Sequence, residues 1–382
     1  MKCRLLLVFI FLFAESSFAQ WIADTDFDVH SKNGINSVYN LEFEKAEKEF
    51  QYLADTYPQH PAGKFFLAMA DWWRIMLDVD NESLDAQFIK KLEVVIDMCD
   101  SLLDINSDDV TALFFKGGAL GFRGRLYANR GSWIKAANDG RMALPIVQHA
   151  FKIAPENFDI LLGIGIYNYY AETIPEKYPL VKPLMVFFPS GDKHKGIRQL
   201  TTAALRAQYA SVEASYFLLQ LYYSYERQLD KALEIANALH VRFPNNVVVH
   251  RYIGRCYVSQ NKWEEARAVF TEIFSRCNNG MTGYTTAAKR EAYYYFGLCA
   301  MNKNQFDEAL QNFYLCDELS RALDKDGESG FMVMTNLRIG MVYDIQQKRQ
   351  YAVQQYNKVL KMKKFENARD LAEQYLRSAY IK

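Results

Sequence analysis

The chain has 382 residues, of which 50% are hydrophobic and 15% aromatic, so it can bury a large core. Lys and Arg together number 45, as do Asp and Glu. This balance provides no net charge that would attract nucleic acid or an anionic membrane, and we expect neither as a partner.

The N-terminal segment has the pattern of a secretory signal peptide. Two basic residues precede an apolar run from Leu5 to Phe13, and the small residues Ser17 and Ala19 precede the expected cleavage point. We therefore expect residues 1–19 to be removed and the protein to be exported, to a bacterial periplasm or outside the cell. A retained anchor is the weaker alternative, because this run spans only about half of a bilayer core.

Four segments share a spaced pattern of small and aromatic residues. In each, a glycine is followed twelve residues later by an alanine and sixteen residues later by an aromatic residue. The members are Gly34, Ala46 and Phe50; Gly254, Ala266 and Phe270; Gly297, Ala309 and Phe313; and Gly340, Ala352 and Tyr356. Two helices cross closely only where side chains are small, so the pattern predicts packed helix pairs with these glycines and alanines as packing residues.

This pattern resembles the tetratricopeptide repeat (TPR) family, whose unit is a helix pair of about 34 residues. The resemblance implies an all-α solenoid, a right-handed superhelix of antiparallel helix pairs, that binds partners and is not an enzyme. We expect residues 20–382 to form one solenoid. Its parts are a first repeat at 28–60, a divergent region of long helices at 61–212, regular repeats at 213–362 and a capping helix at 363–382.

A proline-rich apolar loop, 172–195, interrupts the divergent region. Gly165 and Gly196 occupy the small-residue positions of one pair but are 31 residues apart, where twelve is usual. Because the loop includes Phe187 and Phe188, it is too apolar to stay solvated, and we expect it to pack back on the solenoid and shape a binding surface. The alternative is a structural plug between misaligned repeats.

The region around this loop is similar to the tetratricopeptide repeat protein 39 family. The residues that carry the similarity are the helix "LLGIGIYNYY", the apolar loop, and a turn containing Gly191, Asp192, Lys193 and Gly196. The resemblance covers about residues 108–275 and implies a fold and a scaffold role, without chemistry. The secretory signal departs from that family, so its intracellular roles do not transfer.

No pattern in the chain matches an enzyme or cofactor motif. The six histidines are dispersed, so we predict no metal site, cofactor or catalytic residue, with a spatial histidine cluster as the minor alternative. The cysteines that follow the signal match no disulfide or metal spacing and are predicted to be buried thiols. The glycines of "GGALGFRG" indicate close helix packing, with a phosphate-binding loop as the remote alternative.

Two groups of residues are candidates for binding a partner. The first helices of the repeats should line a concave face, on which the candidates are Tyr216, Tyr223, His250, Tyr257 and Tyr293. A basic run between Lys116 and Arg141 includes Arg123 and Arg130. Salt bridges to neighbouring helices are the main interpretation of this run, and an anionic partner is the alternative.

The expected function is that of a non-enzymatic scaffold for a protein or peptide. The alternative is a carrier of a small apolar ligand or lipid beneath the 174–190 loop. An open polar and aromatic groove would favour the scaffold. A closed, ligand-sized cavity beneath Phe187 and Phe188 would favour the carrier.

Overall fold

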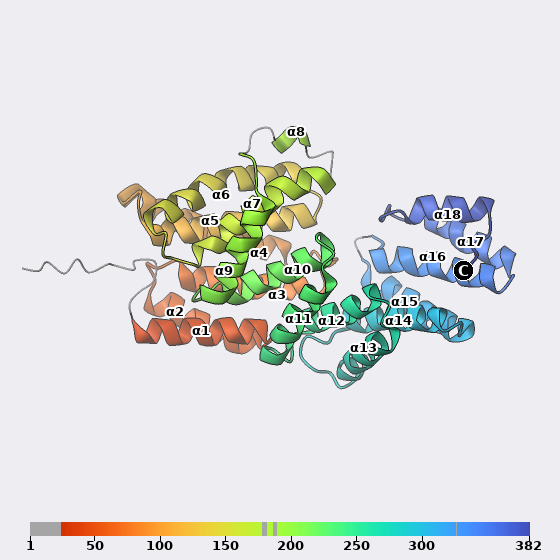
Figure 1. The fold of residues 1–382 in the computed structure, drawn as a ribbon. Coiled ribbons are helices and arrows are strands. Elements are labelled where there is room, and N and C mark those ends of the chain that lie inside the picture. The colour runs from red at the N-terminus through yellow and green to blue at the C-terminus, as the bar shows by residue number, and fades with distance from the viewer. Residues whose placement is uncertain (1–23, 178–181, 186–188, 326) are drawn as a thin grey trace, which may run out of the picture.

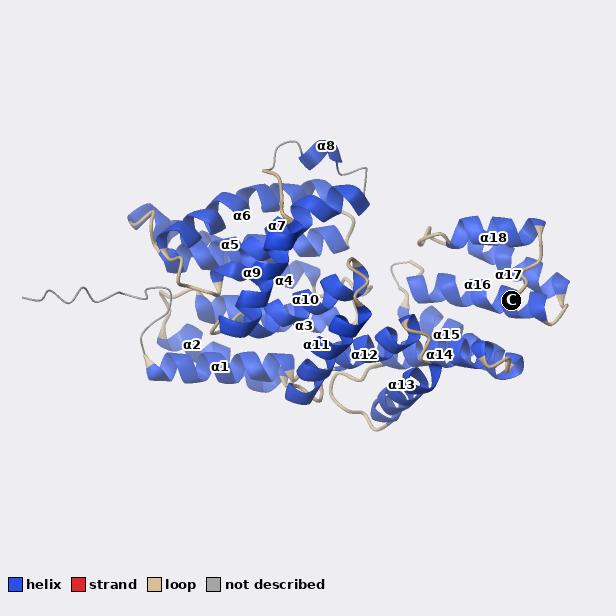
Figure 2. Ribbon diagram, in the orientation of Figure 1, coloured by secondary structure: helices blue, strands red, loops and turns tan. Residues whose placement is uncertain are grey.

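The computed structural model describes residues 24–177, 182–185, 189–325 and 327–382. These residues form eighteen helices and no strand (Figures 1 and 2). The helices are α1 Thr25–Tyr39, α2 Phe43–Thr56, α3 Ala62–Leu77, α4 Asp85–Ile105, α5 Val110–Asn129, α6 Trp133–Ile153, α7 Ile160–Lys177, α8 Lys182–Met185, α9 Lys193–Arg206, α10 Ser211–Ser224, α11 Leu229–Arg242, α12 Val247–Ser259, α13 Trp263–Asn278, α14 Thr286–Asn302, α15 Phe306–Leu323, α16 Gly330–Ile345, α17 Arg349–Lys361 and α18 Ala368–Arg377.

Helices that follow one another in the chain pack as pairs. The pairs are α1–α2, α3–α4, α5–α6, α7–α9, α10–α11, α12–α13, α14–α15 and α16–α17, and we number them one to eight in this order. Helix α18 packs on α17 and α16 at the C-terminal end. The prediction of an all-α, TPR-like solenoid is therefore confirmed. None of the described helices has the length and hydropathy needed to cross a membrane.

The spaced glycines lie where the two helices of a pair cross. A Cβ atom added to Gly34, Gly254 or Gly297 would lie 2.2, 2.6 or 2.4 Å from the nearest ring atom of Phe50, Phe270 or Phe313. Gly340 has the same relation to Tyr356, at 2.5 Å. The aromatic ring of each pair thus occupies the space that a side chain at the glycine would need. The partner alanines, Ala46, Ala266, Ala309 and Ala352, are fully buried.

The apolar insertion lies within pair four, between α7 and α9. A Cβ atom on Gly165 would lie 2.8 Å from Leu200 Cγ, and one on Gly196 would lie 2.7 Å from the Gly165 carbonyl oxygen. The two glycines therefore mark the α7–α9 crossing. The Asp192 carboxylate caps α9 by accepting a hydrogen bond from the Lys195 N–H at 2.8 Å. Phe187 and Phe188 lie outside the described residues, so their packing stays a prediction.

The first pair contacts helices far along the chain. The Asp28 carboxylate on α1 accepts hydrogen bonds from Gln208 and from the Tyr209 hydroxyl, both at 2.8 Å. Near the end of α1, the Tyr39 hydroxyl donates to Glu213 of α10 at 3.0 Å, and the Tyr39 carbonyl accepts from the Asn246 side chain at 2.7 Å. Helices α1–α12 therefore close on themselves, and we call them the N-terminal ring. Helices α14–α18 extend to one side of this ring (Figure 1).

The cysteines that the structure describes are unpaired. Cys99, Cys256, Cys299 and Cys316 are buried and Cys277 is partly buried, in agreement with the prediction of buried thiols. Burial raises the pKa of each thiol to about 11 or 12, so the thiolate is scarce at neutral pH.

Measurements of unfolding free energy can distinguish glycines that lie at helix crossings from glycines that face open space. Gly297→Leu forces a side chain into the Phe313 ring and should cost about 1–3 kcal/mol of unfolding free energy. The matched control is Gly121→Leu, because a Cβ on Gly121 meets no atom within 4 Å. Thermal and urea unfolding should show a loss for the first variant alone. Equal stability of the two variants would contradict this account of the crossing.

Candidate ligand cavity

A cavity of about 820 Å³ lies on the inner side of the N-terminal ring. The first helices of pairs one to five line it, namely α1, α3, α5, α7 and α10, together with α6. Its volume falls within the range of about 300–1,000 Å³ that is usual for ligand pockets. The contact between Tyr39 of α1 and Glu213 of α10 partly encloses the concave side of the first five pairs.

The wall of the cavity is mainly apolar and aromatic. Its aromatic members include Phe65, Phe66, Trp73, Tyr170, Phe217 and Tyr225. Several of these rings pack against others at their edges or tilted, as in the contact between Phe65 and Phe66, whose centroids are 6.0 Å apart. Such rings are held in place by packing and present a preformed apolar surface to a ligand.

Glycines on α5 shape one wall. A Cβ on Gly117 would lie 2.6 Å from Val147 of α6, and one on Gly124 would lie 3.2 Å from Asp139 Cβ, so these two glycines allow α5 and α6 to pack closely. Gly121 differs, because a Cβ there meets nothing within 4 Å and the residue lines the cavity. The predicted role in helix packing therefore holds for Gly117 and Gly124, whereas Gly121 leaves volume to the cavity.

Pair three lacks the aromatic residue that fills other pairs. Gly124 and Ala136 have the twelve-residue spacing of the repeat, but the position sixteen residues after Gly124 is Gly140. Ala136 and Gly140 both line the cavity. The predicted pattern of glycine, alanine and an aromatic residue does not include this crossing, because glycine stands at the aromatic position. Glycine at that position indicates a space between the two helices.

A charged group lies where α5 faces α10. Arg125 of α5 contacts Glu213 at 3.3 Å and donates to the Gln220 side chain at 2.7 Å. Its guanidinium carbon lies 4.8 Å from the ring centroid of Trp72 and 4.2 Å from that of Phe217. Burial raises the pKa of the Glu213 carboxyl, and Arg125 and the Tyr39 hydroxyl oppose that shift. The charges of this group are thus satisfied by the protein itself.

The far end of the cavity reaches the start of the apolar insertion. Ile174 and Lys177, in the last turn of α7, contribute to the wall. The Lys177 ammonium lies 4.2 Å from the ring centroid of Tyr225. The insertion therefore begins at the edge of the cavity, although the cavity is described without Phe187 and Phe188.

The tyrosines and the histidine predicted to bind a partner fall into two groups. Tyr216 is 1% exposed and His250 is 2% exposed, which leaves them almost no surface to offer to a partner. Tyr216 packs between Trp73 of α3 and Tyr252 of α12, whereas His250 is covered by His240 and Tyr284. Tyr223, Tyr257 and Tyr293 are partly buried on α10, α12 and α14.

The two predicted arginines form ion pairs with neighbouring helices. Arg123 makes two hydrogen bonds to Asp139, at 2.8 and 2.7 Å. Arg130 makes two to Asp85, at 2.6 and 2.9 Å. The Asp139 side chain is buried, with 3% of its surface exposed. These contacts support the salt-bridge interpretation of the basic run over an anionic partner site.

Comparisons with known proteins found similarity to solved structures of helical-repeat proteins. No protein-family model matches it, and no curated protein matches its sequence. Human IFIT1, solved as a dimer with PPP-AAAA, is 13% identical over 93% of this chain and 85% of that chain, with a TM-score of 0.47. A TPR protein from Parabacteroides merdae is 16% identical over 82% and 99%, with a TM-score of 0.36.

Yeast Tom70 is 12% identical over 92% of this chain and 95% of that chain, with a TM-score of 0.27. At such identities the similarity to TPR proteins is one of fold alone. These matches do not include the tetratricopeptide repeat protein 39 family, so that resemblance stays a prediction.

We expect Glu213 and Glu291 to contribute to the free energy of unfolding with opposite dependences on pH. Burial raises the pKa of Glu213, so its contribution is present below the ordinary value of 4.5 and is lost as pH rises through the folded-state pKa. Burial also acts to raise the pKa of Glu291, but Arg255 and Arg251 outweigh it and hold that pKa below 4.5. The contribution of Glu291 is therefore present above 4.5 and lost as pH falls.

Urea unfolding measured from pH 3.5 to about 7.5 tests this prediction, because the interval includes the ordinary pKa range of carboxyl groups. The stability difference between the natural chain and Glu213→Gln should shrink or reverse as pH rises. The difference for Glu291→Gln should grow over the same interval. Slopes of the same sign for the two variants would contradict the assignment.

Proposed function

We propose that this chain is an exported, non-enzymatic binding protein that carries a small, mainly apolar ligand in the cavity of its N-terminal ring. The observation that carries the proposal is the partly enclosed, aromatic-walled space of about 820 Å³. Solenoids of helix pairs generally serve as binding scaffolds, and their usual binding surface is an open concave face. Here the contact between α1 and α10 partly encloses the concave face of the first five pairs, which favours a ligand of limited size.

The electrostatics of the cavity favour a ligand without net charge. Arg125 is already bonded to Glu213 and Gln220. Asp159, another acidic residue in the lining, accepts the backbone N–H groups of Tyr209 and Ala210 at 2.9 and 2.7 Å. A charged ligand would lose its hydration and would compete for groups that already have partners, which costs free energy. Apolar surface gains about 25 cal/mol per Å² when it is buried.

Export is part of this proposal and is supported by the signal-peptide pattern of residues 1–19, which lie outside the described residues. We expect the mature chain to begin at Gln20 and to be recovered from the periplasm or the medium. N-terminal sequencing of the exported protein checks this. Recovery of a chain that still begins at Met1 in a membrane pellet would contradict it.

Placing a larger side chain in the cavity should weaken binding and leave the fold intact. Gly121→Leu places a side chain in open space on the cavity wall, and Gly121→Ala is the matched control that adds one methyl group. The neutral fluorescent probe N-phenyl-1-naphthylamine should bind the natural chain and Gly121→Ala. We expect Gly121→Leu to bind it at least tenfold more weakly at an unchanged melting temperature.

The natural ligand can be sought in the same proteins. Solvent extraction and mass spectrometry should release a small apolar compound from the natural chain purified from its exported fraction, and much less from Gly121→Leu. Equal probe affinity for the natural chain and Gly121→Leu would exclude the cavity as the binding site.

A protein partner is the second candidate, and it is favoured by the aromatic residues that remain partly exposed on first helices. Tyr257 on α12 and Tyr293 on α14 retain surface outside the cavity lining. Affinity capture from the exported fraction distinguishes the two functions. A captured protein that is lost with Tyr257→Ala and Tyr293→Ala, but kept with Gly121→Leu, would favour the scaffold function over the carrier. The resemblance of residues 108–275 to the tetratricopeptide repeat protein 39 family fits either function.

A further inference from the structure

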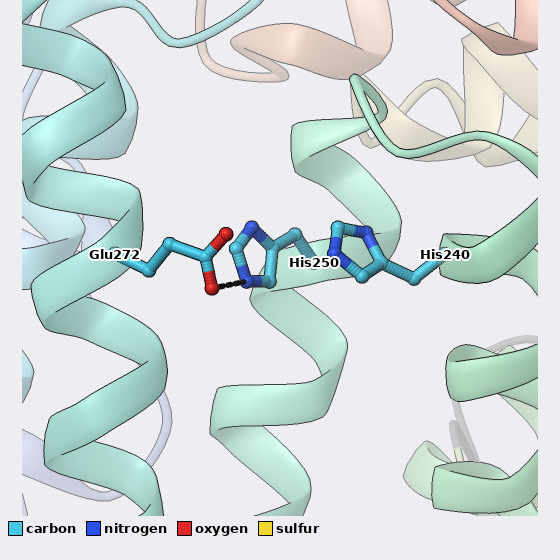
Figure 3. A group of neighbouring side chains, drawn as sticks. All are labelled: His240, His250 and Glu272. Carbon is cyan, nitrogen blue, oxygen red and sulfur yellow. Dashed lines mark ion pairs between the residues drawn. The ribbon is translucent and has the colours of Figure 1, made fainter.

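Two histidines and a glutamate from three successive helices meet beside the N-terminal ring (Figure 3). They are His240 of α11, His250 of α12 and Glu272 of α13. One ring nitrogen of each histidine and one carboxylate oxygen of Glu272 all lie within 4.8 Å of one another. The His250 Nε2 atom is 3.7 Å from the Glu272 Oε2 atom, and the two imidazole rings are stacked with centroids 4.3 Å apart.

Hydrogen bonds within the protein do not satisfy this group. The separation of 3.7 Å between His250 and Glu272 is too long for a hydrogen bond. The Nδ1 atom of His240 is buried and has no hydrogen-bond partner among the described residues. Buried polar atoms of side chains almost always have partners, so hydrogen bonds within the described part of the chain leave His240 incompletely satisfied.

Neighbouring groups orient the His250 ring in a way that suits metal binding through Nε2. The Tyr284 hydroxyl lies 3.0 Å from His250 Nδ1, accepts a hydrogen bond from Arg276 at 2.9 Å, and faces the Pro244 carbonyl at 3.5 Å. If the hydroxyl donates to Pro244, its remaining lone pair accepts the Nδ1–H of His250. That tautomer leaves the Nε2 lone pair directed towards Glu272. A second residue that fixes the tautomer in this way is usual for metal-binding histidines.

Glu272 presents one carboxylate oxygen to His250. Arg276 holds the Oε1 atom of Glu272, so the other oxygen, Oε2, is left to face His250.

We propose that His240, His250 and Glu272 form a binding site for a divalent transition-metal ion, with zinc as the preferred ion. Two imidazoles and one carboxylate are a usual protein ligand set for zinc and leave a fourth position for water. Zinc bonds of about 2.0–2.2 Å require the three donor atoms to draw together. Glu272 supplies most of this movement, because its side chain is 51% exposed. Magnesium prefers oxygen ligands and should not compete.

The test uses the full chain without a histidine tag, stripped of metal by a chelator and titrated with zinc chloride by calorimetry. We expect one zinc ion per chain and a higher melting temperature with zinc but not with magnesium chloride. His240→Ala and Glu272→Gln should each weaken zinc binding at least tenfold. The control His149→Ala should leave it unchanged, because His149 is 43% exposed and pairs with Asp108 away from the cluster.

His250 is left intact because it is buried, and its loss would also disturb packing.

Cobalt(II) gives an independent readout, since tetrahedral coordination by these residues produces an intense visible absorption that both ligand variants should lose. Failure of the folded natural chain to bind stoichiometric zinc would overturn the proposal. Unchanged zinc affinity of the His240→Ala and Glu272→Gln variants would also overturn it. These outcomes are independent of the cavity, because none of the three residues lines it.

Discussion

The contact between α1 and helices α10–α12 determines what the inner side of this solenoid can do. Repeats in a solenoid usually contact only their neighbours, which leaves the concave face open. In this chain the Tyr39 hydroxyl reaches Glu213, and the Asn246 side chain reaches the Tyr39 backbone. Gly283, at φ +81°, approaches Leu41 so closely that a Cβ atom there would lie 2.3 Å from Leu41 Cδ1. Tyr39 and Glu213 also line the partly enclosed space of about 820 Å³.

Buried charges pair at the α5–α10 contact and at the α12–α14 contact, and their pairing restricts how the helices can be arranged. Arg125 and Glu213 join α5 to α10, and Arg255 makes two hydrogen bonds, at 2.6 and 2.7 Å, to the fully buried Glu291 of α14. Buried ion pairs add little net stability, because desolvation offsets most of the attraction. Separating the partners of a buried ion pair costs free energy, however. The pairs therefore fix the position of each helix against its neighbour, where apolar contacts alone would allow sliding.

The sequence predicted the helix pairs well because the interaction that forms them is local. A glycine and an aromatic residue sixteen positions apart, such as Gly297 and Phe313, belong to one pair and meet at its crossing. The closure of the ring could not be predicted in this way, because Tyr39 and Glu213 are 174 residues apart and neither belongs to a motif. For the same reason Tyr216 was expected on an open concave face, whereas the ring buries it.

The candidate sites also depend on contacts between residues that no sequence motif relates. His240 and His250 lie ten residues apart on two different helices, so no spacing rule for one helix relates them, and Glu272 comes from a third. In the sequence, Gly121 cannot be distinguished from Gly117 and Gly124. The structure shows that a Cβ atom on Gly121 would meet no other atom within 4 Å. Composition identified small residues on this helix. Which of them pack and which leave a cavity depends on partners that are distant in the chain.

Helix α12 carries a ligand of the proposed metal site and also contacts that close the N-terminal ring. Its first residues follow Asn246, which bonds to Tyr39 of α1, and Arg251 of the same helix donates to the Met76 carbonyl of α3 at 3.4 Å. His250 lies between these two contacts in the sequence. A metal ion bound by His240, His250 and Glu272 would tie α12 to α11 and α13, whereas Asn246 and Arg251 tie the same helix to α1 and α3.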